Sequence, residues 1–172
     1  MIKSKFTEIS NSLGGEYFFS ETRGKGITDT YHTTDYHKLI IPYKESEIIA
    51  IYEFGNRSTA TITTKSSFRN IPISFNISKR NHFFKLFNKN TKSLKVSSQN
   101  KNTQIKIEDA LFNSGLEKIA SDTVFEPMIK LSQNKDEIEV FTIFYLGFQN
   151  KENSILPIIN FYKDLIDLIN RS

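Results

Sequence analysis

The last third of the chain, residues 138–169, constrains the fold most, because it joins a strongly apolar strand pattern to an amphipathic helix pattern. Side chains of a strand alternate between its two faces, and here both faces are mostly apolar. One face would hold Val140, Thr142, Phe144 and Leu146, and the other Phe141, Ile143 and Tyr145. Such a strand is usually central in a sheet that is covered on both sides. We interpret the second face as core, with an apolar pocket or a subunit interface as the alternative.

The helix that follows this strand is amphipathic, with one polar stripe on an otherwise apolar surface. Asn153 or Ser154 can cap its start, and Pro157 falls in the first turn, where a missing N–H costs little. Each large apolar side chain that it buries contributes roughly 1.5–3 kcal/mol before entropy is counted. We therefore expect this helix to pack on the sheet. It is too short and too polar to span a bilayer.

The rest of the chain predicts further helices and strands in a defined order. Ile2, Phe6, Ile9 and Leu13 share one side of a short helix that Gly14 and Gly15 would end. Strands are expected at 16–20, 38–43, 48–54, 59–64, 71–77 and 125–131, a second helix at 108–120, and flexible loops at 21–35 and 88–104. The alternative for 88–104 is a short edge strand around Leu94 and Val96 that is flanked by loops. Short strand connections leave little room for parallel crossovers. The prediction is a single α+β domain, 1–172, in which an N-terminal, a middle and a C-terminal amphipathic helix pack on a mainly antiparallel sheet.

The composition narrows the functions that the chain can have. Without cysteine it has no disulfide, no thiolate nucleophile and no zinc–cysteine site. The N-terminus carries Lys3, Lys5 and Glu8, so it lacks the apolar run of a signal peptide, and no stretch is long enough to cross a membrane. We expect a cytoplasmic protein, peripheral to a membrane if it binds lipid. The sequence has no phosphate loop and no nucleophile elbow, so an enzyme is not the favoured class.

The charge distribution gives the leading hypothesis on function. Residues 54–107 contain eleven basic side chains and no acidic one. The candidate anion-binding residues are Lys79, Arg80, Lys85, Lys89, Lys92 and Lys95, which surround the apolar run Phe83, Phe84 and Phe87. Such residues can neutralise phosphates, so we predict a non-enzymatic binding module for an anionic partner: a membrane surface, a nucleic acid or an acidic protein. The competing interpretation is a solvated face that keeps the protein soluble.

Two further hypotheses remain open. The first is a carrier for a small apolar ligand or lipid, which would use a pocket against the sheet beside Phe141, Ile143 and Tyr145. The second is a metal-dependent enzyme, for which Asp29, His32, Asp35 and His37 are the weak candidates. The spacing of these four matches no metal motif, and a loop that enters a strand commonly carries solvated His and Asp. We therefore predict no metal and no cofactor, and the sequence makes no prediction of oligomeric state.

Overall fold

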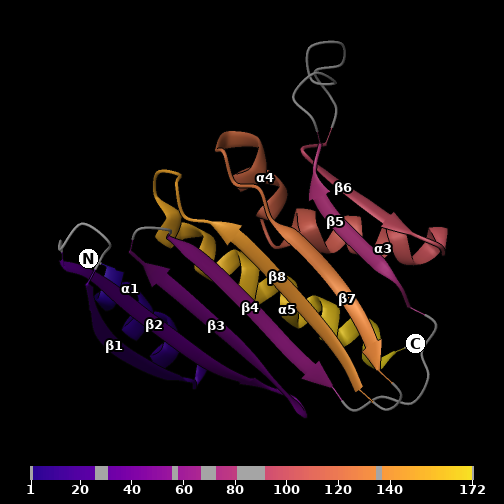
Figure 1. The fold of residues 1–172 in the computed structure, drawn as a ribbon. Helices are drawn as coiled ribbons and strands as arrows, with labels where there is room; N and C mark the ends of the chain where they lie inside the picture. Colours follow the sequence, from indigo (N-terminus) through magenta and orange to yellow (C-terminus); the bar gives the residue numbers. More distant parts are fainter. Residues whose placement is uncertain are drawn as a thin grey trace.

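The structure, a computed structural model, describes residues 2–25, 31–55, 58–66, 73–80, 92–134 and 137–171. In chain order the elements are α1 (Ile2–Leu13), β1 (Glu16–Lys25), β2 (Tyr31–Tyr43), β3 (Ser46–Phe54), β4 (Thr59–Ser66), β5 (Phe75–Lys79), β6 (Leu94–Ser98), α3 (Lys101–Asn113), α4 (Leu116–Asp122), β7 (Met128–Asn134), β8 (Glu137–Tyr145), the 3₁₀ helix η1 (Lys151–Ser154) and α5 (Ile155–Asn170) (Figure 1). The helices predicted at the two ends of the chain are confirmed.

All eight described strands belong to one antiparallel sheet in the order β1-β2-β3-β4-β8-β7-β5-β6. The first four form a meander, and β8 pairs with β4 over eight residues, from Ser66 opposite Ile138 to Thr59 opposite Tyr145. The strand predicted to be central, β8, therefore lies between β4 and β7. The α+β class, with an antiparallel sheet and N-terminal, middle and C-terminal helices, is confirmed.

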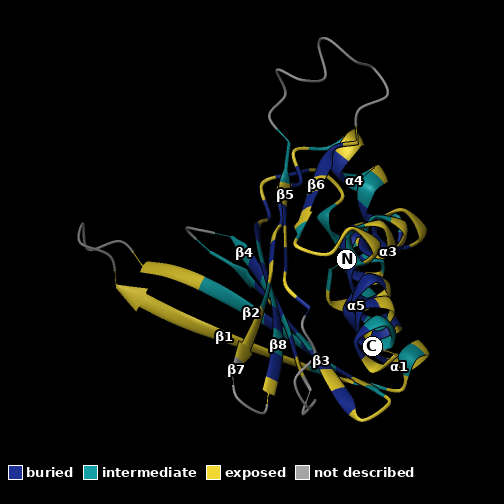
Figure 2. Cartoon of the chain, turned by 90° about the vertical axis from the view of Figure 1, so that its right-hand side faces the viewer, coloured by how far each residue is buried: buried dark blue, intermediate teal, exposed yellow. Residues whose placement is uncertain are grey.

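The described helices lie together on one side of the sheet, so the molecule has two layers (Figure 2). α1 packs on β1 and β2 through Phe6 and Ile9, which are buried. α5 packs along the middle of the sheet with eight buried residues, which agrees with its apolar periodicity. The core lies between the two layers, and each strand contributes alternate residues to it, as Ile48, Ala50 and Tyr52 do in β3.

The loop predicted at 21–35 is wrong for the described residues, because β1 runs on to Lys25 and β2 begins at Tyr31. In this region β1 pairs only with β2, and β2 meets β3 only from Asp35 onward. The outer part of this hairpin is exposed and projects away from the helices (Figure 2). We call residues 20–25 and 31–35 the β-arm. Neither of its faces is buried, so its sequence lacks the alternation that marks a strand.

The long loop predicted at 88–104 is wrong where the structure describes this segment, from residue 92 onward, and the alternative of a short edge strand around Leu94 and Val96 is confirmed. β6 occupies Leu94–Ser98, with Leu94 and Val96 buried against the helices. α3 then begins at Lys101, because the side chain of Asn100 accepts hydrogen bonds from the backbone N–H groups of Asn102 and Thr103. The middle helix, expected at 108–120, is in fact two helices. Gly115 separates them with a φ of 84°, a conformation that favours glycine.

Candidate binding surface

The face of the sheet that points away from the helices, which we call the open face, is covered by no helix or strand that the structure describes (Figure 2). Its side chains align in rows across the strands, because the register of each strand pair is defined. The row across its middle consists of Glu16, Ile40, Ile49, Thr63, Phe141 and Lys130. The next row consists of Phe18, Lys38, Ile51, Thr61, Ile143 and Met128.

Two outer rows flank these two. One contains Ser20, Tyr36, Glu53, Thr59 and Tyr145, and the other Pro42, Glu47, Lys65, Glu139 and Ser132. Large apolar side chains on the open face are exposed: Tyr145 is 71% exposed, Phe18 48%, Met128 41% and Ile51 37%. At a full accessible area of roughly 200 Å² for each, these four alone expose several hundred Å². Exposed apolar area of this size on one face is in the range of the largest apolar patch of a typical monomer, which is often a functional surface.

The interpretation of Phe141, Ile143 and Tyr145 as core is wrong, because all three lie on the open face. Phe141 and Ile143 are half-buried by their neighbours in the sheet, and Tyr145 is exposed. The other side of the same strand holds Val140, Thr142 and Phe144, which are buried under the helices. The interface alternative therefore agrees with the structure better than the core interpretation does.

The basic residues of the middle segment do not gather on one surface where the structure describes them. Lys79 is on the helix side of β5 with a side chain only 7% exposed, and its amine lies 3.7 Å from the carboxylate of Glu126. Lys92 donates to Glu108 at 2.7 Å. Hydrogen bonds from Lys92 and Gln104 hold the pKa of the Glu108 carboxyl below its usual range.

The remaining candidates of this segment separate further. Lys95 lies on the open face of β6, on the opposite side of the sheet from Lys79. The Nε atom of Arg80 is buried and has no hydrogen-bond partner among the described residues. Lys85 and Lys89 lie outside the described residues. Two of the four described candidates, Lys79 and Lys92, are thus matched with individual carboxylates.

The described residues of the candidate metal site, His32, Asp35 and His37, do not form one cluster. His37 is only 1% exposed and lies under α1, where its Nδ1 atom is 2.8 Å from the Tyr17 hydroxyl and its ring stacks on Phe6. Burial lowers the pKa of His37 because it disfavours the charged ring, while the carboxylate of Asp35 opposes this shift. His32 is exposed on the other face of β2, and Asp29 lies outside the described residues. Within the described ranges, no group of three or more His, Cys, Asp or Glu residues could hold a metal ion.

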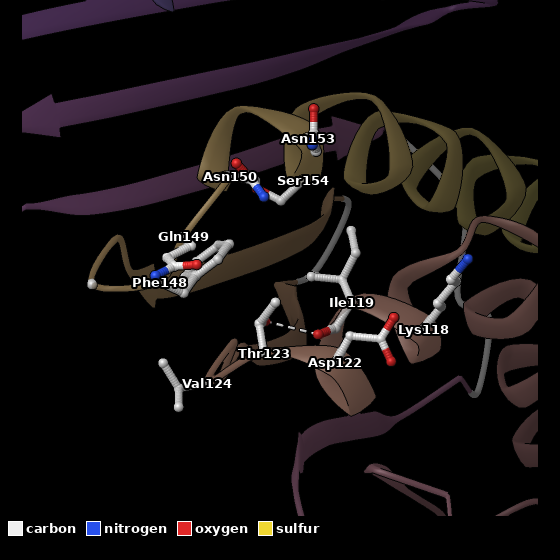
Figure 3. Close-up of a pocket in the computed structure, with 11 residues that line it drawn as sticks. Lys118, Ile119, Asp122, Thr123, Val124, Phe148, Gln149, Asn150, Asn153 and Ser154 are labelled. Carbon is white, nitrogen blue, oxygen red and sulfur yellow. Dashed lines mark hydrogen bonds between the residues drawn. The ribbon is translucent and has the colours of Figure 1, made fainter.

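Two of the hollows on the helix side of the molecule are lined by α4. A cleft of about 680 Å³ separates α4 from the segment after β8 (Figure 3). Lys118 and Asp122 line one side of it, and Phe148, Gln149 and Asn150 line the other. A groove of about 560 Å³ lies beside it, between β6, α3 and α4, with Leu94, Leu111 and Phe112 in its lining. The carboxylate of Glu117 anchors this groove, because it accepts hydrogen bonds from the backbone N–H groups of Ser93 and Leu94.

Comparison of the chain with protein-family models, with curated proteins and with solved structures finds no match in any of the three. None of the helices that the structure describes is long and apolar enough to cross a membrane. The open face is therefore identified as a candidate binding surface from the geometry of this chain alone.

Sequence reasoning named Phe141, Ile143 and Tyr145 as pocket or interface candidates but favoured the core, because a strand pattern gives two faces and does not say which layers cover them. One signal was present in β4, where Thr59, Thr61 and Thr63 alternate with buried Ala60 and Ile62. A central strand whose outward side chains are all polar, here the three threonines and Lys65, indicates a face that is not packed by the core of its own chain.

Proposed function

We propose that this protein is a non-catalytic interaction module that binds a protein partner on the open face of its sheet. The observation that carries the proposal is one row of the open face, in which Lys38 and Thr61 alternate with four large apolar side chains: Phe18 on β1, Ile51 on β3, Ile143 on β8 and Met128 on β7. Burial of apolar surface contributes about 25 cal/mol per Å², so a partner gains by covering these side chains. We also propose a cytoplasmic location, because the chain has no cysteine.

The shape of the open face favours a macromolecule over a small ligand. Small molecules bind in concave sites that enclose most of their surface. The open face is broad and extends over six strands, and the β-arm projects from its edge on the same side (Figure 2). A two-stranded ribbon exposed on both faces is marginally stable by itself, and contact with a partner would stabilise it.

The anionic-partner hypothesis has less support in the geometry. Lys79 and Lys92 already pair with carboxylates of this chain, and Lys79 and Lys95 point to opposite sides of the sheet. A surface that neutralises phosphates needs free amines that converge on one side. We therefore keep the predicted class, a non-enzymatic binding module, and move its site from the basic segment to the open face.

Binding of the neutral apolar dye Nile red tests the proposal, at protein concentrations low enough for the chain to be monomeric. A variant with Phe18→Ser, Ile51→Thr and Ile143→Thr should lose most of the dye fluorescence of the natural chain. Its free energy of unfolding should change by less than about 1.5 kcal/mol, because surface substitutions usually change stability by no more than about 0.5 kcal/mol each.

The matched control carries Ile105→Thr, Phe112→Ser and Val124→Thr, three exposed apolar residues that lie away from the open face. It should bind the dye as the natural chain does. Loss of dye binding in the control, with retention in the first variant, would move the site to the groove and cleft on the helix side and overturn the proposal.

A further inference from the structure

We infer that the partner that covers the open face is a second copy of this chain. The inference rests on the proposed function, because it names the partner of the same surface. Two sheets that pack face to face lie about 10 Å apart with their strands within about 30° of each other. In the proposed dimer a two-fold axis runs along the strands, between β3 and β4. This symmetry places β1 opposite β7 of the second copy, β2 opposite β8, and β3 opposite β4.

Charge and side-chain type match in this dimer. Because the axis is parallel to the strands, each row of one copy faces the same row of the second copy. Glu16 therefore faces Lys130, and Glu47 faces Lys65. Each of these opposite-charge pairs occurs twice by symmetry. Lys65 also lies 3.3 Å from Glu137 of its own chain, so Glu16 with Lys130 is the clearer pair. No pair of like charges meets within these rows. The facing apolar pairs are Phe18 with Met128, Ile40 with Phe141 and Tyr36 with Tyr145.

Two other pairs are compatible with this packing. Lys38 faces Ile143, where its apolar stem can lie along the isoleucine while its amine approaches the ring of Tyr145 in the next row. Glu53 faces Thr59, whose hydroxyl can donate to a carboxylate. The angle between the sheets displaces the outermost residues by about one row, a distance that the long side chains of Glu16 and Lys130 can bridge.

The area of the open face is sufficient for a dimer. Six strands about 4.8 Å apart and four rows about 6.7 Å apart cover about 24 Å by 20 Å, or roughly 500 Å² per copy. Two copies together bury about 1,000 Å², which is less than the roughly 1,200–2,000 Å² of stable interfaces and fits a weak, reversible dimer. The β-arm projects on this side of the sheet, so it would lie beside the second copy and add to this area (Figure 2).

Sedimentation equilibrium of charge variants tests the inference. The natural chain should dimerise reversibly, and Glu16→Lys or Lys130→Glu alone should weaken the dimer about tenfold, because each change places like charges opposite each other twice. The double variant Glu16→Lys with Lys130→Glu should restore the affinity to within about threefold. The control Lys95→Glu, on the open face beyond the six paired strands, should leave the affinity unchanged.

A cysteine introduced into this cysteine-free chain gives a second measurement. Thr61→Cys places a thiol beside the two-fold axis, with its Cα atom about 11 Å from that of its copy. This distance is too long for a disulfide but within the span of a short bismaleimide, so this reagent should yield a covalent dimer. Ser78→Cys, on the open face of β5 away from the axis, should stay monomeric. The inference would be overturned if the charge variants at Glu16 and Lys130 left the dimer affinity unchanged and both introduced cysteines cross-linked equally. The contact between the copies would then lie elsewhere.

The failure of this inference can be separated from that of the proposed function. If the chain stays monomeric up to about 1 mM but binds Nile red through the open face, the inference of a second copy is wrong. The proposed function would then stand, with a different protein as the partner. A monomer whose dye binding does not depend on Phe18, Ile51 and Ile143 would overturn both.

Discussion

The hydroxyl of Thr142 lies 2.7 Å from the hydroxyl of Tyr162, in the buried contact between β8 and α5. Tyr162 in turn donates to the backbone carbonyl oxygen of Ile62, 2.8 Å away. This contact ties α5 to β4 and β8 on the same side. Because strand side chains alternate, the neighbours of Thr142, which are Phe141 and Ile143, must point to the opposite side. The helices therefore cover the face of β8 that carries Thr142, and the buried hydrogen bonds of Thr142 and Tyr162 lie on that face.

Removal of the Tyr162 hydroxyl should therefore destabilise the protein. Tyr162→Phe leaves the Thr142 hydroxyl without this partner in a fully buried position, which costs about 1–3 kcal/mol in the free energy of unfolding. Urea denaturation followed by circular dichroism measures this. The matched variant Tyr145→Phe removes an exposed hydroxyl and should change stability by less than about 0.5 kcal/mol. Equal effects of the two substitutions would contradict the role of Tyr162.

His37 should make stability depend on pH. Burial lowers its pKa in the folded chain below the ordinary value of 6.5, so the unfolded chain binds a proton first as pH falls. The stability that the neutral ring contributes is fully present above about pH 6.5 and is lost as pH falls from there through the lowered pKa. Unfolding free energies between pH 8 and about pH 5 should show this loss.

The variant His37→Phe keeps an aromatic ring between Phe6 and Phe54, which both contact His37 in the natural chain. Its stability should change less over the same pH range, because no proton can bind at this position. A variant with the same pH dependence as the natural chain would show that another group is responsible.

Glu117 should stabilise the contact between α4 and β6. Its carboxylate accepts hydrogen bonds from the backbone N–H groups of Ser93 and Leu94, and hydrogen bonds to a charged group contribute about 1.5–3 kcal/mol. Glu117→Gln removes the charge and one acceptor, so we expect a loss of about 1–2 kcal/mol, measured by urea denaturation. The control Glu8→Gln affects an exposed ion pair on α1 and should cost less than about 0.5 kcal/mol. A smaller loss for Glu117→Gln than for this control would refute the assignment.

The elements that bury one regular face could be predicted from the sequence. The spacing of Phe6 and Ile9 predicted α1, and the apolar repeat of the last sixteen helical residues predicted α5. The β-arm could not be predicted, because neither of its faces is buried and its side chains have no reason to alternate. The start of α3 was missed because its first turn is polar, although Asn100 was an available cap signal.

The candidate site was harder to predict than the fold, for a reason that β5 and β6 illustrate. Lys79 and Lys95 belong to one run of positive sequence, but they occupy opposite sides of the sheet. A charge run therefore becomes a surface only when the strand register allows it. Phe141 and Ile143 gave the converse error, since an apolar strand face has the same sequence whether its own chain or a partner covers it.

The central claim is that the open face is bare in the isolated chain, and the reactivity of introduced cysteines tests it most directly. Ile51→Cys lies on the open face, whereas Val140→Cys lies under the helices, where Val140 is fully buried. In dilute native protein, a thiol reagent should modify the cysteine at position 51 at least about a hundredfold faster than the cysteine at position 140, whose reaction requires opening of the fold. Equal, slow modification of both would show that the face is covered by the chain itself and would contradict the account.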